Sequence, residues 1–319
     1  MKKAITVICI AVLLCVVLCG CGGFRLISIG NGDAGNFDSR FDNGASYSYG
    51  SAEITDSITD VEIEWASGSV DITCGGDKIS FEESANKELT DENRMVWSVQ
   101  GSQLVIKFAR DNSFHALWFS KTLRLTLPEA FCAESFCIDC ASADTNADSL
   151  CAKRLELSSA SGKIVVGSID ANDVEISAAS GNVDIAQSGS CGELDISTAS
   201  GKVSAKLDEV RELGVDTSSG EVNVSANMLG RAGIDTASGD VRLTVFNSFD
   251  NTEIETASGA VSLFLPESQG LTAEIDTASG KLDSDIPITF KSGNYVCGDG
   301  SARLEIDTAS GDITLGRAK

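Results

Sequence analysis

Apolar and polar residues alternate along most of the chain, in pairs of short runs on either side of a fixed phrase. In one copy Leu213 and Val215 precede the phrase, Val222 and Val224 follow it, and polar residues stand between them. Alternation with a period of two places successive side chains on opposite faces of a strand. Each copy therefore predicts two short β-strands with one buried face, and an all-β chain.

The phrase, most often Thr-Ala-Ser-Gly, recurs at a nearly constant step. Between Gly162 and Gly280 successive glycines of the phrase lie 19 to 21 residues apart. A period of about 20 residues is typical of a solenoid, whose coils bury their apolar face only by stacking on one another. A degenerate copy of the phrase ends at Ala143, and the complete copies end at Gly68, Gly162, Gly181, Gly201, Gly220, Gly239, Gly259, Gly280 and Gly311.

Local chemistry of the phrase predicts a sharp corner between the two strands of a coil. The glycine is expected to take a positive φ, because it has no Cβ to clash, and the preceding serine to hydrogen-bond to its own local backbone. In a parallel stack at about 4.8 Å spacing, each residue then lies on its counterpart in the next coil. Threonine stacks on threonine and valine on valine.

Both ends of the repeat region depart from this period. Alternating segments at 61–65, 70–72, 95–99, 104–108 and 123–128 predict strands that cap one end, where a bare sheet edge would invite aggregation. Near the other end, the step from Gly280 to Gly311 is 31 residues, so about 11 residues are inserted there.

The first residues resemble a bacterial lipoprotein signal. Lys2 and Lys3 precede an apolar run at 4–18, and Leu18-Cys19-Gly20-Cys21 is similar to a lipobox. The resemblance implies cleavage before Cys21, its acylation, and anchoring on the outer face of the cell membrane. We expect a signal peptide at 1–20, a flexible tether at 21–50, an N-terminal β region at 51–130 and the solenoid at 131–319, with 51–319 as one continuous domain.

The net charge of −23 excludes nucleic acid as a partner, because phosphates would be repelled. Counted from the glycine of the phrase, position −4 forms a column of carboxylates that is a candidate cation-binding site. The alternative is a solvated face whose repulsion is screened by salt. The Gly-Gly-x-Gly-x-Asp repeat of calcium rolls is absent. The column consists of Asp216, Asp235, Glu255, Asp276 and Asp307.

Seven cysteines follow Cys21, and an odd number cannot all pair with one another. The spacing of Cys132, Cys137 and Cys140 suggests zinc, but no histidine lies near them. Cys140 occupies the threonine position of its phrase and Cys191 an apolar position, so both are expected in the core. No metal is assigned, and the pairing of the others stays open, although an external compartment permits disulfides.

Catalysis and a contact loop are the remaining alternatives. The only histidine, His115, stands with Phe114, Trp118 and Phe119 in a segment that is either a contact loop or a cap on the core. The basic residues are scattered through different phases of the repeat, and the repeated serines are explained by the turn. We expect no enzyme and no cofactor.

The whole pattern resembles a bacterial β-strand-repeat family of unknown function, named "putative adhesin" and related to toast-rack and head-GIN domains. The resemblance covers residues 50 to 316 and depends on the Trp65-Ala66-Ser67-Gly68 opening, the strand at 123–128, the serial Ala-Ser-Gly coils and Gly298-Asp299-Gly300. It implies a right-handed, single-stranded β-helix and a surface protein without catalytic residues. The predicted function is adhesin-like binding or scaffolding of an unknown protein or polysaccharide; envelope-stress sensing through a membrane partner is the alternative.

Overall fold

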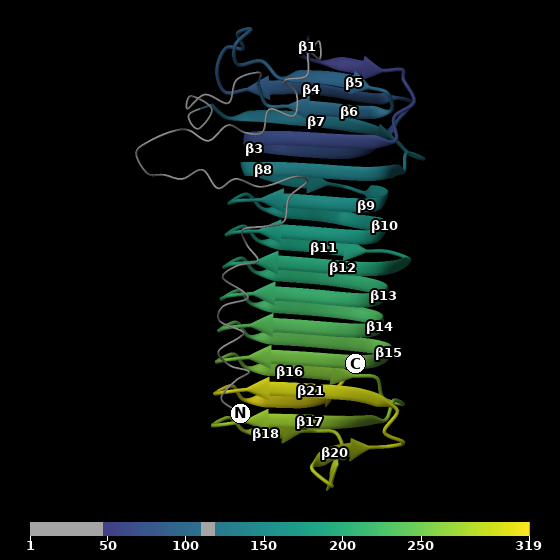
Figure 1. The fold of residues 1–319 in the computed structure, drawn as a ribbon, viewed down its shortest axis with the longest axis vertical. Helices are drawn as coiled ribbons and strands as arrows, with labels where there is room; N and C mark the ends of the chain where they lie inside the picture. The colour runs from purple at the N-terminus through teal and green to yellow at the C-terminus, as the bar shows by residue number, and fades with distance from the viewer. Residues whose placement is uncertain (1–46, 110–118, 319) are drawn as a thin grey trace.

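The computed structural model describes residues 47–109 and 119–318, and these form one all-β sheet system (Figure 1). No helix in this part of the chain has the length and apolar character to cross a membrane. Cys21 lies outside the described residues. The strands are β1 (Ser48–Tyr49), β2 (Ala52–Ile54), β3 (Asp60–Gly76), β4 (Ile79–Ala85), β5 (Val96–Gln100), β6 (Gln103–Lys107), β7 (Lys121–Pro128), β8 (Ala133–Ala147), β9 (Leu150–Ser159), β10 (Ile164–Ala178), β11 (Val183–Gln187), β12 (Ser190–Thr198), β13 (Val203–Thr217), β14 (Val222–Thr236), β15 (Val241–Thr256), β16 (Val261–Leu265), β17 (Leu271–Thr277), β18 (Leu282–Ser284), β19 (Thr289–Lys291), β20 (Asn294–Cys297), β21 (Ala302–Thr308) and β22 (Ile313–Arg317).

Parallel pairing of successive coils makes the chain a β-solenoid. β13 pairs with β14 from Val203 with Val222 to Thr217 with Thr236, and β14 pairs with β15 in the same way except for a register shift between Ala226 and Met228. The segment before each phrase lies in one wall, here called the entry wall (212–217 in one coil). The segment after the phrase lies in the opposite wall, the exit wall (222–226). Like residues stack on like, which confirms the prediction.

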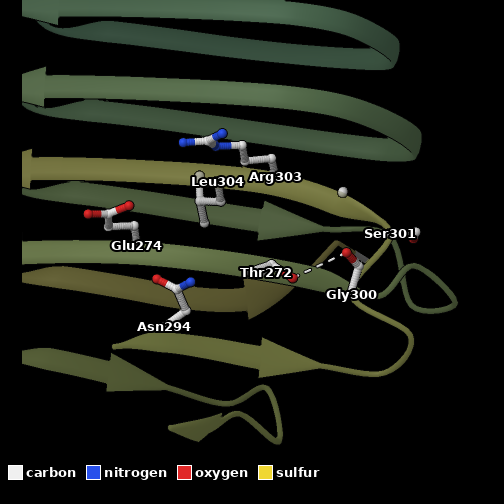
Figure 2. Close-up of a pocket in the computed structure, with 8 residues that line it drawn as sticks. Thr272, Glu274, Asn294, Gly300, Ser301, Arg303 and Leu304 are labelled. Carbon is white, nitrogen blue, oxygen red and sulfur yellow. Dashed lines mark hydrogen bonds between the residues drawn. The ribbon is translucent and has the colours of Figure 1, made fainter. Parts of the chain in front are cut away.

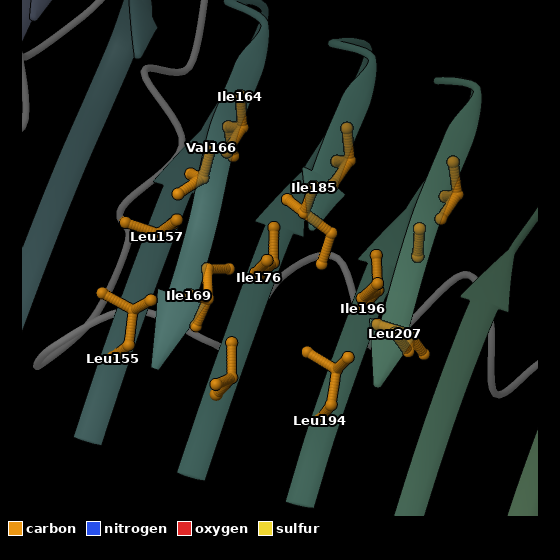
Figure 3. Close-up of a cluster of buried hydrophobic side chains, with 14 of the residues drawn as sticks. Leu155, Leu157, Ile164, Val166, Ile169, Ile176, Ile185, Leu194, Ile196 and Leu207 are labelled. Atoms are coloured by element: carbon orange, nitrogen blue, oxygen red, sulfur yellow. The ribbon is translucent and has the colours of Figure 1, made fainter. Parts of the chain in front are cut away.

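The core consists of the inward residues of both walls, one short row per coil. Figure 3 shows Leu155, Ile176 and Ile196 from successive coils among the buried side chains between the walls. Each of these is at most 1% exposed. A single coil offers only a few such side chains, so the apolar surface is buried mainly by the coils above and below.

The glycines of the phrase are needed for a different reason from the one predicted. Among the glycines that end the phrase, only the early Gly68 has a positive φ, at 105°, and none from Gly162 onward does. Instead, a Cβ on Gly239 would lie 1.9 Å from the carbonyl oxygen of Gly220, and one on Gly259 would lie 1.8 Å from that of Gly239. The prediction of positive φ was wrong: the corner needs close contact between backbones of neighbouring coils, which only glycine permits.

The side chains that form hydrogen bonds at the corner also differ from those predicted. The threonine three residues before the glycine is buried, and its Oγ1 accepts the glycine N–H, as for Thr236 and Gly239 at 2.9 Å. The serine hydroxyl donates to a carbonyl of the neighbouring coil, as Ser238 does to Ser218 at 3.4 Å. Threonine therefore closes the corner locally, while serine joins coils, which corrects the predicted local role of serine.

The N-terminal end is capped by antiparallel strands. β3 pairs in parallel with β8 on one side and with β6 and β7 on the other, and β5 and β4 continue these antiparallel. Inside this cap, Lys121 Nζ lies 2.9 Å from Glu83 Oε2, with the two side chains 0% and 3% exposed. The ammonium also faces the Trp65 and Phe108 rings and donates to the carbonyl of Phe108. Burial lowers the pKa of Lys121, although Glu83 opposes the shift.

At the C-terminal end the spatial order departs from the chain order. β21 pairs in parallel with β15 on one side and β17 on the other, and β22 lies in the same way between β16 and β18. Figure 1 shows the yellow β21 between β16 and β17. The last coil, 302–317, is therefore intercalated between two coils that precede it in the chain. β20 and β19 extend beyond β17 as an antiparallel hairpin at the end of the stack.

A disulfide joins Cys132 to Cys151, which are 19 residues apart. Within the described residues the unbonded cysteines are Cys74, which is exposed, and Cys140, Cys191 and Cys297, which are buried. The buried state of Cys140 and Cys191 agrees with their predicted core positions. The partner of Cys132 is thus Cys151, which is not one of the three cysteines whose spacing suggested zinc.

Loss of this disulfide is expected to destabilise the solenoid markedly. Closing a loop of this length stabilises a fold by about 3 kcal/mol in the chain-entropy model, so the Cys132→Ser/Cys151→Ser protein should lose about 2 to 4 kcal/mol. The measurement is the urea midpoint followed by circular dichroism. Cys74→Ser is the control and should stay within about 0.5 kcal/mol, since Cys74 is exposed and unbonded. Equal midpoints for all three proteins would contradict the expectation.

Candidate functional site

The outward side of the entry wall carries the predicted carboxylate column. Pairing places Asp216 beside Asp235, Asp235 beside Glu255, Glu255 beside Asp307, and Asp307 beside Asp276. All five predicted members thus share one column, here called column −4. The intercalated coil changes the order, because Asp307 stands between Glu255 and Asp276.

A second acidic column runs beside it at position −6, which sequence reasoning missed although the same register argument reveals it. Its members, in spatial order, are Glu156, Glu175, Asp195, Gly214, Gly233, Glu253, Glu305 and Glu274. Gly214 and Gly233 interrupt this column of carboxylates near its centre. The carboxylate of Asp195 lies over Gly214, where a Cβ would be 2.3 Å from Asp195 Oδ1. Columns −4 and −6 together are called the acidic face.

Carboxylates of this face are harder to ionise than free ones. Burial, followed by repulsion from Asp216, Glu255 and Glu253, raises the pKa of Asp235 to about 6. Burial is also the first cause of the raised pKa values of Asp195, Asp216, Glu255 and Asp307. In the part of the chain that the structure describes, no group of three or more His, Cys, Asp or Glu side chains has the geometry to hold a metal ion. The cation site stays a prediction.

Neutralising Asp235 is expected to stabilise the protein at neutral pH. Its folded pKa of about 6 exceeds its ordinary value of 3.8. The folded state therefore holds the proton more tightly, and its stability falls as the pH rises from about 4 to 7. Asp235→Asn should raise the free energy of unfolding at pH 7.5 by about 1 to 2 kcal/mol, a discounted value because the side chain is partly exposed.

Urea denaturation at pH 7.5 and pH 5 measures this effect. The wild type should be more stable at pH 5, and Asp235→Asn should reduce that difference. Asp184→Asn, on the exposed outward side of the exit wall, is the matched control and should change neither value by more than about 0.5 kcal/mol. A less stable Asp235→Asn protein at pH 7.5 would show that the carboxylate has an attractive partner.

The predicted contact loop is only partly described. Phe114, His115 and Trp118 lie outside the described residues, while Phe119 is 8% exposed and belongs to the core of the cap. Its place beside β7 agrees with the capping alternative for this one residue. Contact by the other three is a prediction that the structure does not test.

A pocket of about 290 Å³ opens where the insertion interrupts the regular coils (Figure 2). β17 contributes Thr272 and Glu274, β20 contributes Asn294, and β21 contributes Arg303. Figure 2 shows Glu274 and Asn294 at one end of this pocket and Thr272 with Gly300 at the other. The sequence signal was the lengthened step before Gly311, but the pocket depends on the intercalation that the sequence does not show.

The loop after β20 borders one end of this pocket. Gly298 and Gly300 have φ values of 59° and 72°, which favour glycine, so the chain turns back tightly over β17. Thr272 Oγ1 donates to the carbonyl of Gly300 at 3.2 Å, and Asp299 Oδ1 accepts from Ser301 N at 3.1 Å. These contacts fix the loop against the strand.

Taken together, the parallel stacking of the coils and the close contact of their corner glycines define a β-solenoid built from repeated coils. The chain belongs to the Toastrack DUF4097 family, whose model matches residues 58–316. This confirms the predicted resemblance and the β-solenoid class. The family is not a known enzyme family.

A solved structure is similar to this chain, at low sequence identity. A crystal structure described as a "putative cell adhesion protein" from Clostridium sporogenes is similar at 12% identity, over 86% of this chain and 100% of that chain, with a TM-score of 0.25. No curated protein matches the chain.

Proposed function

We propose that the chain is a lipid-anchored extracytoplasmic protein that binds or scaffolds a protein or polysaccharide at the cell surface, without catalysis. The observation that carries the proposal is the entry wall, an extended surface whose outward side chains repeat in register from coil to coil. Solenoids use such extended, rigid surfaces for binding. A weak contact that recurs in each coil can then add up to a higher overall affinity, without any new type of contact.

Location outside the cytoplasm has separate support. The Cys132–Cys151 disulfide suits an oxidising compartment, because cytosolic thiols are kept reduced. The lipobox-like Leu18-Cys19-Gly20-Cys21 motif supports acylation of Cys21. Two or more acyl chains on one residue hold a protein firmly on a bilayer.

Cell fractionation tests the anchor. Wild-type protein should be in the membrane fraction and be cleaved by protease added to intact cells, whereas Cys21→Ser should lose the lipid mass. Cys19→Ser is the matched control, two residues away, and should keep the lipid. Protection of the wild type from external protease would contradict the proposed location, and lipid on the Cys21→Ser protein would contradict the proposed residue.

Adherence tests the binding role. Cells lacking the protein should adhere less to surfaces coated with polysaccharide or matrix protein, and the full chain supplied on a plasmid should restore adherence. Unchanged adherence together with altered expression of envelope-stress genes would contradict the proposal and favour the sensing alternative.

A further inference from the structure

We infer that the pocket between β17, β20 and β21 binds one neutral sugar unit of a surface polysaccharide. The inference rests on the proposed function, since it names a ligand class for a surface-binding protein. The pocket is the place where the insertion breaks the repeat, so Asn294 and the loop at 298–300 add groups that the regular coils lack. One such site differs from the periodic walls in that it can recognise a single unit.

The lining offers both donors and acceptors in a small space. Arg303 supplies a guanidinium that only donates, and Glu274 supplies a carboxylate that only accepts. Asn294 and Ser301 can do both. A sugar hydroxyl also donates and accepts, so adjacent hydroxyl groups match this mixture. A volume of about 290 Å³ suits a monosaccharide better than an extended peptide or a nucleotide.

Charge around the pocket selects a neutral ligand. Arg303 is already near Glu305, with Nη2 and Oε2 3.5 Å apart, so its charge is partly compensated. Glu274 continues column −6, and Asp307 and Asp276 end column −4 beside it. A uronic acid or a phosphate would be repelled by these carboxylates. A lipid chain finds no apolar cover, because the lining side chains are polar except for Ala302 and Leu304, whose side chains are buried.

The pocket is formed before a ligand arrives. The bond from Thr272 to the Gly300 carbonyl holds the loop, and a side chain on Gly300 would meet Thr272 Oγ1 at 2.8 Å. Parallel pairing fixes Thr272 beside Arg303 in the adjacent strand. A preformed site loses less entropy on binding, although a small, open and polar site gives only weak affinity. We expect a dissociation constant on the order of 1 to 10 mM for one sugar unit.

Saturation-transfer NMR on the full chain in detergent micelles tests the inference. The probes are the methyl glycosides of glucose, galactose, mannose and N-acetylglucosamine, with glucuronic acid as the anionic probe. At least one neutral glycoside should bind, and glucuronic acid should not. Arg303→Ala and Asn294→Ala should each weaken binding of that glycoside at least tenfold, because each removes a group that orients the ring.

Arg231→Ala is the matched control. Arg231, Asn251 and Arg303 occupy the same column in successive coils, so Arg231 is an arginine in the same register outside the pocket. It should bind the glycoside as the wild type does. The inference is overturned if no neutral glycoside binds below about 20 mM, if glucuronic acid binds as tightly, or if Arg303→Ala binds like Arg231→Ala.

Adherence of the wild-type and deletion strains separates this inference from the proposed function. If the NMR test fails while wild-type cells still adhere through the protein, the pocket is not the binding site and the surface role stands. If the deletion strain adheres normally, the surface role itself has failed.

Discussion

A Gly239→Ala protein is expected to lose at least about 3 kcal/mol of stability, or to fail to fold. The new Cβ would lie 1.9 Å from the Gly220 carbonyl oxygen and 2.8 Å from the Gly220 carbonyl carbon. These are backbone atoms of the next coil, so relief requires separating two coils that share a hydrogen-bonded ladder. Urea denaturation followed by circular dichroism, together with the yield of folded protein, measures the effect.

Gly233→Ala is the matched control, in the same coil and six residues earlier. A Cβ at Gly233 meets no heavy atom within 4 Å, and its φ is not positive. Alanine there should leave stability unchanged or raise it by about 0.5 to 1 kcal/mol, since glycine weakens a strand. If Gly239→Ala were as stable as Gly233→Ala, the result would contradict the close approach of the coils at the corner.

The second large effect is expected at the buried ion pair of the N-terminal cap. Lys121→Met should cost about 3 to 5 kcal/mol, because it leaves the Glu83 carboxylate buried without its cation. Methionine keeps much of the length and the contact with Trp65 and Phe108, so lost volume is a minor cause. Thermal and urea unfolding measure the change.

Two further variants distinguish charge from packing. Arg124→Met breaks an exposed pair on the same two strands, with Arg124 and Glu82 57% and 63% exposed, and should stay within about 0.5 kcal/mol. Adding Glu83→Leu to Lys121→Met should recover part of the loss, because the stranded charge is then gone. A double variant that is less stable than the wild type by the sum of both single losses would contradict this account.

Much of the fold could be predicted because the same local pattern of apolar, polar and glycine residues recurs in coil after coil. Alternation around Leu213 and Val222 identified both walls, and the constant step identified their register. The same register predicted column −4 correctly. The spacing of 19 residues between Cys132 and Cys151 equals one coil and could have identified the disulfide, since it places both residues at the same level of adjacent coils.

Other features depend on contacts that periodicity cannot express. The glycine of the phrase was interpreted through its own backbone conformation, whereas its constraint comes from the coil beside it. Lys121 and Glu83 are 38 residues apart in a region without a repeat, so nothing local connects them. The intercalation was hidden for the opposite reason: coils 271–284 and 302–317 carry the same phrase, and either could pair with β15 and β16.

That equivalence has a consequence for synthesis on the ribosome. The segment 271–284 emerges before 302–317 and meets the free edge of β15 and β16 first, with matching side chains. The finished structure nevertheless has the later segment in that position. Either the nascent chain leaves the edge vacant, or an early pairing is released and exchanged. A chain stalled before residue 302 would therefore hold a different arrangement of its last coils, and translation speed through this region can influence which arrangement forms first.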